Sequence, residues 1–159
     1  MDPYFTPDYL FSFFGRLRGM KEDTINARKK ELFEYFGIMD FKDKKVEELS
    51  TGMKQKVSIA VSLVHDPEIV IFDEPTNGLD IITARAVLDY LRMLKEQGKT
   101  IIVSTHVMSE AQKLCDRIAI IIDGRLAALG TLAELEAMTK TGDLEDAFFE
   151  LYKQHGKEA

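Results

Sequence analysis

Residues 69–80 read Ile69-Val-Ile-Phe-Asp-Glu-Pro-Thr-Asn-Gly-Leu-Asp80 and contain the strongest structural signal in the chain. Four apolar residues lead directly into two adjacent acids, and a proline and a glycine-bearing turn follow. The apolar run is too short for a helix and does not alternate with polar residues. It therefore predicts a strand buried on both faces, as in a parallel sheet covered by helices.

The two acids, Asp73 and Glu74, stand at the carboxyl end of this predicted strand. Ligands of open α/β sheets bind just beyond that end. A pair of acids there suits nucleotide hydrolysis, because one can hold a hydrated metal ion while the other orients or deprotonates a water molecule. The alternative is an acidic loop that merely caps the following helix, and the dipeptide alone does not decide between the two.

The composition is that of a soluble globular protein with one domain's worth of residues. The chain has 159 residues, of which 45% are hydrophobic and 30% charged, and a net charge of −6. The acidic balance argues against a general nucleic-acid binder. A single cysteine, Cys115, excludes an internal disulfide framework. No apolar run approaches the ~18 residues that a membrane span needs, so we expect any membrane role to be peripheral.

The N-terminal region predicts two helices. Thr6-Pro7 is a favourable helix start, and Gly19 ends the helical periodicity. Asp23 is the expected N-cap of a second helix that ends at Gly37. Six aromatic residues fall in the first fourteen positions: Tyr4, Phe5, Tyr9, Phe11, Phe13 and Phe14. The default interpretation is the core of a small helical subdomain. The alternative is a partner-binding groove, because one helical face cannot bury so many aromatics.

The segment Leu49-Ser-Thr-Gly-Met-Lys-Gln-Lys56 opens a further predicted helix that runs to about His65. Ser50 or Thr51 can cap it, and Gly52 allows a ligand to approach the backbone closely. Its first turns carry lysines and no carboxylate, which makes this helix start a plausible phosphate seat. Many ordinary helices begin in the same way, so the segment alone is weak evidence.

The second half of the chain continues the α/β pattern. Asp80 can serve as the N-cap of a helix over 81–96, and a second buried strand is expected at Thr100–Ser104. Thr105-His106 follows directly, so His106 lies at the same predicted sheet edge as the two acids. The remaining expected elements are a helix at 108–114, a strand at 117–122, a hairpin turn at Asp123-Gly124, an antiparallel strand at 125–129, a capping box at Thr131–Glu134 and a last helix opened by Asp143.

In this order and spacing, these motifs resemble the ATP-binding subunit of an ABC (ATP-binding cassette) transporter, in a variant similar to drug- and sodium-export members. The resemblance covers about Pro7 to Leu151. Its motifs are the signature sequence at Leu49–Gln55, the Walker B strand at Val70–Asp73 with the catalytic glutamate Glu74, the D-loop at Asn77–Asp80 and the switch histidine His106.

Two features depart from the family pattern. Thr51 replaces the first glycine of the signature, and Met53 stands where glutamine is commoner. The phosphate-binding loop Gly-x-x-x-x-Gly-Lys-Ser/Thr is absent from the sequence, as is the family's glutamine-bearing loop. Gly98-Lys99-Thr100 is not this loop, because it precedes a strand and lacks the first glycine. The chain thus resembles the back part of such an ATPase.

The resemblance implies an α/β fold. It implies a P-loop NTPase fragment with a mainly parallel sheet, covering helices, an N-terminal helical subdomain and a C-terminal helix. The expected division is a helical signature subdomain at 1–66, an α/β core at 67–130 and C-terminal helices at 131–159. The family places its P-loop strand between the strands that are here 100–104 and 117–122. We expect this slot to be closed by direct pairing of these strands or filled by a neighbouring chain, because unpaired buried backbone groups are costly.

The resemblance also implies a role for each motif residue, with ATP and Mg²⁺ as cofactors. Asp73 would hold Mg²⁺ through water, Glu74 would activate the attacking water, and His106 would sense the γ-phosphate. Residues Ser50, Thr51, Gly52 and Met53 would contact ATP bound by the opposite subunit, and Asp80 would couple the two sites.

The implied partners are a second nucleotide-binding subunit and a membrane-spanning permease, with no nucleic acid. The implied location is the cytoplasmic face of the membrane, and the implied function is to power export by ATP-driven dimerisation. The chain alone is expected to be inactive. Two alternatives remain: a non-catalytic truncated interaction domain, and a soluble ABC-type head used in DNA repair or translation.

Overall fold

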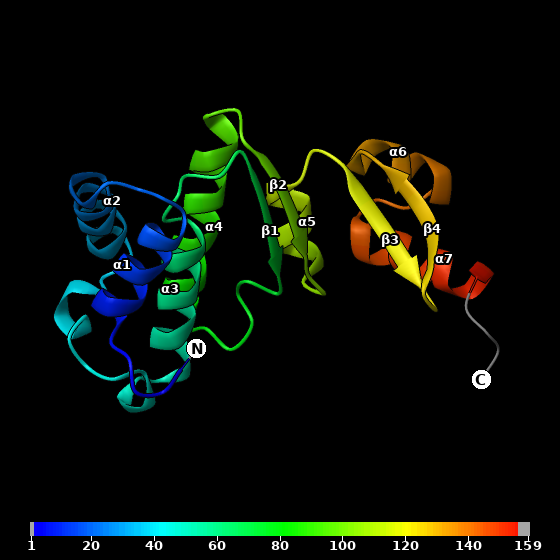
Figure 1. Ribbon diagram of the computed structural model, residues 1–159. Coiled ribbons are helices and arrows are strands. Elements are labelled where there is room, and N and C mark those ends of the chain that lie inside the picture. The colour runs from blue at the N-terminus through cyan, green and yellow to red at the C-terminus, as the bar shows by residue number, and fades with distance from the viewer. Residues whose placement is uncertain (1, 156–159) are drawn as a thin grey trace. The chain divides into compact units, whose positions relative to one another are not determined.

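A computed structural model describes residues 2–155 and divides into two compact units between Ser104 and Thr105 (Figure 1). The α/β class, the helical subdomain and the C-terminal helix are confirmed. The three-part division into 1–66, 67–130 and 131–159 stays a prediction, and the last four residues of its third part lie outside the described residues.

The first unit begins with a helical part. It contains α1 (Pro7–Leu17), α2 (Glu22–Tyr35), the short 3-10 helices η1 (Met39–Phe41) and η2 (Val46–Glu48), and α3 (Thr51–Ser62). The start of α1 is as predicted, because the Thr6 hydroxyl accepts the Tyr9 N–H at 3.2 Å and Pro7 is the first helical residue.

The predicted N-cap of the second helix is wrong. Lys21 occupies that position without a side-chain hydrogen bond, and Asp23 lies inside the first turn. Arg16 donates from Nε and Nη2 to the two carboxylate oxygens of Glu22, at 3.0 and 2.8 Å. This pair stabilises Glu22 in the first turn, where an acid is favoured, so the helix starts before Asp23.

The N-terminal aromatics are mostly not core residues. Of the six, Phe11 is fully buried and packs edge-on against Phe33 with ring centroids 5.2 Å apart. Phe14 is half-buried, whereas the other four are exposed: Tyr4, Phe5, Tyr9 and Phe13. The default core interpretation is therefore wrong for these four. Tyr9 and Phe13 lie on a side of α1, and Tyr4 and Phe5 in the segment before it, that no described residue covers.

The first unit ends with a parallel pair of strands, β1 (Ile69–Asp73) and β2 (Thr100–Ser104), which the helix α4 (Ile81–Glu96) connects. The register pairs Ile69 with Thr100 and Asp73 with Ser104. Because the two strands run in the same direction, their carboxyl ends meet at one edge. α4 packs against β2, and its residues Val87, Leu91 and Leu94 are buried.

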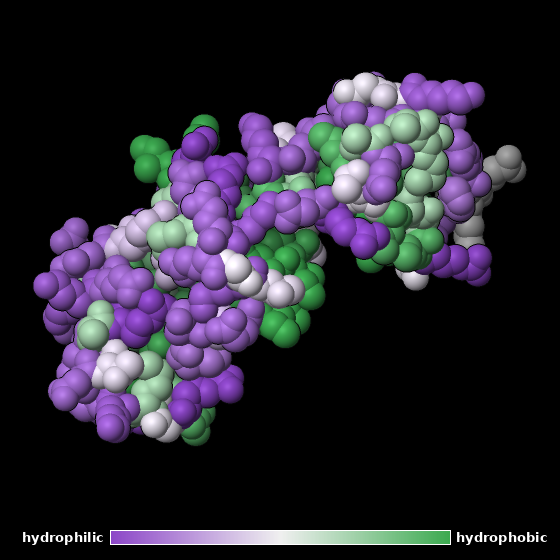
Figure 2. All heavy atoms as spheres, turned by 90° about the horizontal axis from the view of Figure 1, so that it is seen from above, coloured by the Kyte–Doolittle hydropathy of each residue, from purple (hydrophilic) through white to green (hydrophobic). Residues whose placement is uncertain are grey.

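The prediction that this sheet is buried on both faces is wrong. Ile69, Ile71 and Ile102 are 61%, 71% and 53% exposed, whereas Val70 between them is 5% exposed. The three isoleucines share one face, because alternate strand residues point the same way and the register pairs Ile71 with Ile102. The apolar run therefore belongs to a sheet with one face that lies under α4 and one face that no element of the first unit covers. In Figure 2, hydrophobic side chains interrupt a largely hydrophilic surface.

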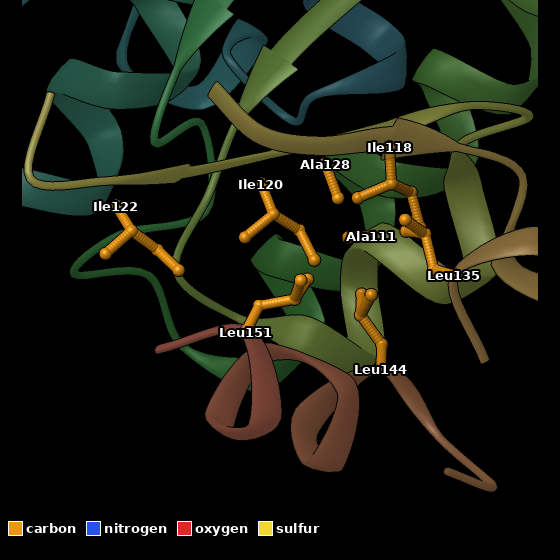
Figure 3. Packing of buried hydrophobic residues seen from close by; sticks show 8 residues of the cluster. All are labelled: Ala111, Ile118, Ile120, Ile122, Ala128, Leu135, Leu144 and Leu151. Carbon is orange, nitrogen blue, oxygen red and sulfur yellow. The ribbon is translucent and has the colours of Figure 1, made fainter. Parts of the chain in front are cut away.

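The second unit is a hairpin with three helices. Its elements are α5 (Met108–Leu114), β3 (Ile118–Ile122), β4 (Arg125–Gly130), α6 (Leu132–Thr139) and α7 (Leu144–His155). Asp123 and Gly124 have positive φ values of 48° and 73°, as the predicted hairpin turn requires. The core brings together side chains from both strands and all three helices, namely Ala111, Ile118, Ile120, Ile122, Ala128, Leu135, Leu144 and Leu151 (Figure 3).

The strands of residues 2–155 form two separate two-stranded sheets, β1-β2 and β3-β4. The expected closure of the slot by direct pairing of β2 with β3 is therefore wrong. The ladder partner of β2 is β1 and that of β3 is β4, and the two pairs belong to different compact units. Filling of the slot by a neighbouring chain stays a prediction. No helix in the same range is both long and apolar enough to cross a membrane.

Candidate functional site

The two acids of the sequence motif lie at the edge where β1 and β2 end together. Asp73 is the last residue of β1 and pairs with Ser104, the last residue of β2. The Ser104 hydroxyl donates to Oδ1 of Asp73. The N–H of Glu74 donates to the Ser104 carbonyl at 3.0 Å and lies 3.3 Å from the Ser104 hydroxyl. A single residue of the neighbouring strand therefore contacts both acidic positions.

Glu74 has an unusual backbone conformation. Its φ is +47°, in the left-handed region that residues other than glycine seldom occupy. Such a conformation costs about 1–3 kcal/mol and is found preferentially at active sites and ligand clamps. It also interrupts the strand, so Glu74 does not continue the alternation of β1. Asp73 is exposed and Glu74 is half-buried, which gives the two carboxylates different surroundings.

Asp80 is the N-cap of α4, as predicted. Its carboxylate accepts the N–H groups of Ile82 and Thr83, both at 3.0 Å, and the Thr83 hydroxyl at 2.7 Å. The hydrogen bonds from the Thr83 hydroxyl and from these amides lower the pKa of Asp80. This capping role is sufficient to explain an aspartate here, so its coupling role stays a prediction.

The start of α3 lies against the turn that follows the acids. Ser50 caps the helix by accepting the Met53 N–H at 3.2 Å, and the first turn contains no acidic residue. A Cβ atom built on Gly52 would lie 3.7 Å from Leu79, and one on Gly78 would lie 3.9 Å from Thr51. Two predicted site segments, 50–53 and the D-loop 77–80, are thus neighbours within the first unit.

A side-chain hydrogen bond reinforces this arrangement. Gln55 Nε2, one turn further along α3, donates to the carbonyl of Pro75 at 3.4 Å. The Ser50-capped helix start and the loop after Glu74 are therefore linked both by packing and by a polar contact.

His106 belongs to the second unit, where it is exposed and precedes α5. The Thr105 hydroxyl accepts the Val107 N–H at 3.0 Å and so shapes the turn into that helix. The expected position of His106 beside Asp73 and Glu74 stays a prediction.

The exposed carboxylate of Asp73 at the end of β1 fits a hydrated magnesium ion. Among the described residues there is no group of three or more histidine, cysteine, aspartate or glutamate side chains that could hold a metal. Mg²⁺ is typically bound by one or two carboxylates, several waters and the phosphates of a nucleotide. An exposed carboxylate whose Oδ1 is already oriented, as in Asp73, can meet this requirement.

Sequence reasoning missed Ser104 as a member of the site. Serine at the end of a strand is common and carries no motif of its own. In the structure both strands have five residues and their register pairs Ser104 with Asp73, an alignment that the predicted strand ends did not establish.

Comparisons with known proteins support the resemblance. The family model described as ABC transporter matches residues 7–77. The ABC transporter ATP-binding protein NatA of Bacillus subtilis is 41% identical over 136 residues, which are 86% of this chain and 55% of the relative. The Nod factor export ATP-binding protein I of Burkholderia lata is 42% identical over 130 residues, which are 82% of this chain and 43% of the relative.

A solved structure agrees with the sequence relatives. A protein described as the ATP-binding subunit of an ABC transporter superposes with a TM-score of 0.89 at 28% identity, covering 95% of this chain and 64% of that one. The chain spans about half the length of the curated relatives that it matches.

Proposed function

Because the chain belongs to the ATP-binding subunits of ABC transporters, we propose that it is part of a subunit that hydrolyses ATP to power export across a membrane. The observation that carries this proposal is the pair Asp73 and Glu74 at the joint end of β1 and β2. The neighbouring start of α3, with Ser50 as its cap, supports it.

The two acids take different parts in hydrolysis. Asp73 holds Mg²⁺ through a water molecule, with its exposed carboxylate already oriented by Ser104. When bound, Mg²⁺ neutralises negative charge that develops on the phosphates. Glu74 orients and deprotonates the attacking water as a general base. Its left-handed backbone sets its carboxylate apart from the strand that carries Asp73.

Residues 50–53 contact the γ-phosphate of ATP bound by a second nucleotide-binding subunit. The positive end of the α3 dipole and the absence of an acid in its first turn favour an anion at this place. ATP held between two subunits then drives their dimerisation. Asp80, at the end of the adjoining turn, couples the two sites, and His106 senses the γ-phosphate.

Docking to a membrane-spanning permease uses the exposed aromatic residues before and along α1. The Phe5 and Tyr9 rings stack with centroids 4.5 Å apart, and those of Tyr9 and Phe13 lie 6.1 Å apart. Leu17 continues this stripe at helical spacing and is 67% exposed. A cytoplasmic helix of the permease covers these side chains, which places the protein peripherally at the cytoplasmic face of the membrane. The net charge of −6 argues against nucleic acid as a partner.

The chain as printed hydrolyses little or no ATP by itself. Its sequence lacks the loop whose amides and lysine bind the phosphates, so both binding and charge neutralisation lose their main supports. A phosphate-release assay on this chain tests the point. Turnover that is robust and that Glu74→Gln abolishes would contradict the expected inactivity.

The phosphate-contacting role of α3 is tested by titrating the ¹⁵N-labelled chain with inorganic tripolyphosphate at high concentration, because the sequence lacks the loop that would hold ATP itself. We expect amide shift changes at Gly52 and Met53. Gly52→Asp should abolish them, because a carboxylate at the helix start repels phosphate. Gly142→Asp is the matched control and should retain them, because it adds the same charge in the second unit, where a Cβ meets nothing within 4 Å. Equal shifts in all three proteins would refute the role.

A further inference from the structure

We propose that Ser104 is a positioning residue that holds Asp73 and Glu74 in the geometry needed for ATP hydrolysis. This inference rests on the proposed function, because it assigns Ser104 a part in the same site. It follows from the contacts at the joint end of β1 and β2, where the hydroxyl and the carbonyl of one serine engage two consecutive acidic residues.

The Ser104 hydroxyl has the chemistry to serve both neighbours at once. A serine hydroxyl carries one donor hydrogen and two acceptor lone pairs. Its hydrogen is directed to Oδ1 of Asp73, and its oxygen lies 3.3 Å from the Glu74 nitrogen as an acceptor. The Asp73 carboxylate is thereby fixed through one oxygen. Its other oxygen remains available to accept a hydrogen bond from a metal-bound water.

The same serine fixes the backbone at Glu74. The N–H of Glu74 is shared between the Ser104 carbonyl, at 3.0 Å, and the hydroxyl. The carbonyl bond extends the ladder by one position, just where the φ of +47° turns the chain away from the strand. The direction of the Glu74 side chain therefore depends on how firmly its amide is held by the end of β2.

The proposed role requires a side-chain hydroxyl at position 104. Alanine at 104 would keep the carbonyl bond to Glu74 and lose both contacts of the hydroxyl. Threonine would keep the hydroxyl and is well suited to a strand. Thr100 is a matched control, because it lies on the same strand and the same face, four residues earlier, and pairs with Ile69 instead of an acid.

The test compares the unmodified chain with Ser104→Ala, Ser104→Thr and Thr100→Ala by NMR. The first readout is the pair of Hα–Hβ couplings of Asp73, which report whether its side chain occupies one rotamer. The second is the broadening of the Asp73 and Glu74 amides by Mn²⁺, added alone as a substitute for Mg²⁺. The melting temperature is recorded for all four proteins.

We expect one dominant Asp73 rotamer in the unmodified chain, in Ser104→Thr and in Thr100→Ala, and averaged couplings in Ser104→Ala. The Mn²⁺ concentration for half-maximal broadening should rise about three- to ten-fold in Ser104→Ala, the factor that one hydrogen bond represents. Threonine should restore it.

Two other outcomes distinguish a failure of the role proposed for Ser104 from a failure of the metal-holding role proposed for Asp73. If Ser104→Ala lowers the melting temperature while the Asp73 couplings and the Mn²⁺ response stay unchanged, the serine is merely structural and the proposal is overturned. If Mn²⁺ fails to broaden Asp73 even in the unmodified chain, the metal-holding role of Asp73 is refuted, and with it the purpose assigned to Ser104. The Hα–Hβ couplings of Asp73 would still show whether the hydrogen bond from Ser104 orients its side chain.

Discussion

Replacement of Gly15 by alanine should destabilise the first unit, although alanine is the better helix former. Gly15 lies in α1 where this helix packs against α2 and the end of α3. A Cβ atom at this position would lie 2.7 and 2.9 Å from two carbons of Ile25 and 3.3 Å from Val64. Ile25 and Val64 are themselves buried, at 0% and 1% exposure, so a shift of either side chain must be taken up by the surrounding core.

Two effects of opposite sign decide the magnitude. Exchanging glycine for alanine inside a helix gains about 1 kcal/mol from propensity, and less near a helix end. Forcing a methyl group into a filled core typically costs about 1–3 kcal/mol. Contacts below 3.0 Å to the fully buried side chain of Ile25 place Gly15→Ala toward the upper part of that range. We therefore expect a net loss of about 1–2 kcal/mol in the free energy of unfolding.

The assay is urea unfolding followed by circular dichroism and by the NMR intensities of α1 amides, which isolate the first unit. Gly52→Ala is the control, because a Cβ there meets nothing closer than 3.7 Å. Its stability should be unchanged or slightly raised. Ile25→Val removes one of the two close carbons, so in the double variant the loss should be smaller than the sum of the single losses. A Gly15→Ala protein as stable as the unmodified chain would refute the packing argument.

Three further perturbations have defined outcomes. Leu135 is fully buried in the core of the second unit, so Leu135→Ala should lower the unfolding free energy of that unit by about 2–5 kcal/mol. The urea midpoint of the α1 amides should stay unchanged. A shift of the urea midpoints of both units would contradict this expectation. Burial, and then the charge of Arg18, lower the pKa of His65, so Arg18→Gln should raise the midpoint of its NMR titration toward the ordinary imidazole value. Because the pKa of Asp80 is lowered in the folded state, its capping stabilises α4 at pH values above the ordinary carboxyl pKa. This stabilisation is lost as the pH falls through the folded-state pKa of Asp80. Amide exchange in α4 should show this acid sensitivity in the unmodified chain and lose it in Asp80→Asn.

Elements with strong local signals were predicted well from the sequence. The α4 bounds, Ile81–Glu96, agree with the expected helix, and Ser50, Asp80 and Thr131 cap their helices as expected. Each cap depends on a side chain and an amide two or three residues away, so the sequence contains the whole interaction. The prediction of Asp23 as an N-cap was wrong because the interaction that decides this helix start is not local in sequence. The start of α2 depends on Arg16, which lies on another helix.

Features that depend on distant segments were not predictable in this way. The exposure of Ile69, Ile71 and Ile102 depends on what covers the sheet, which an apolar run cannot reveal. The contact between Ser104 and Asp73 joins residues 31 positions apart and requires the parallel register. The motifs pointed to Asp73 and Glu74 because these two acids are neighbours in sequence. The serine that contacts both of them became visible only in three dimensions.

The isoleucine face of β1 and β2, which no element of the first unit covers, should affect how this chain behaves at high concentration. Three β-branched side chains on one flat surface, next to the free edge of a two-stranded sheet, favour stacking of one molecule on another. The purified chain should therefore show concentration-dependent light scattering. Ile71→Thr keeps the strand propensity and removes part of the apolar surface, so it should raise the solubility limit without altering the core under α4.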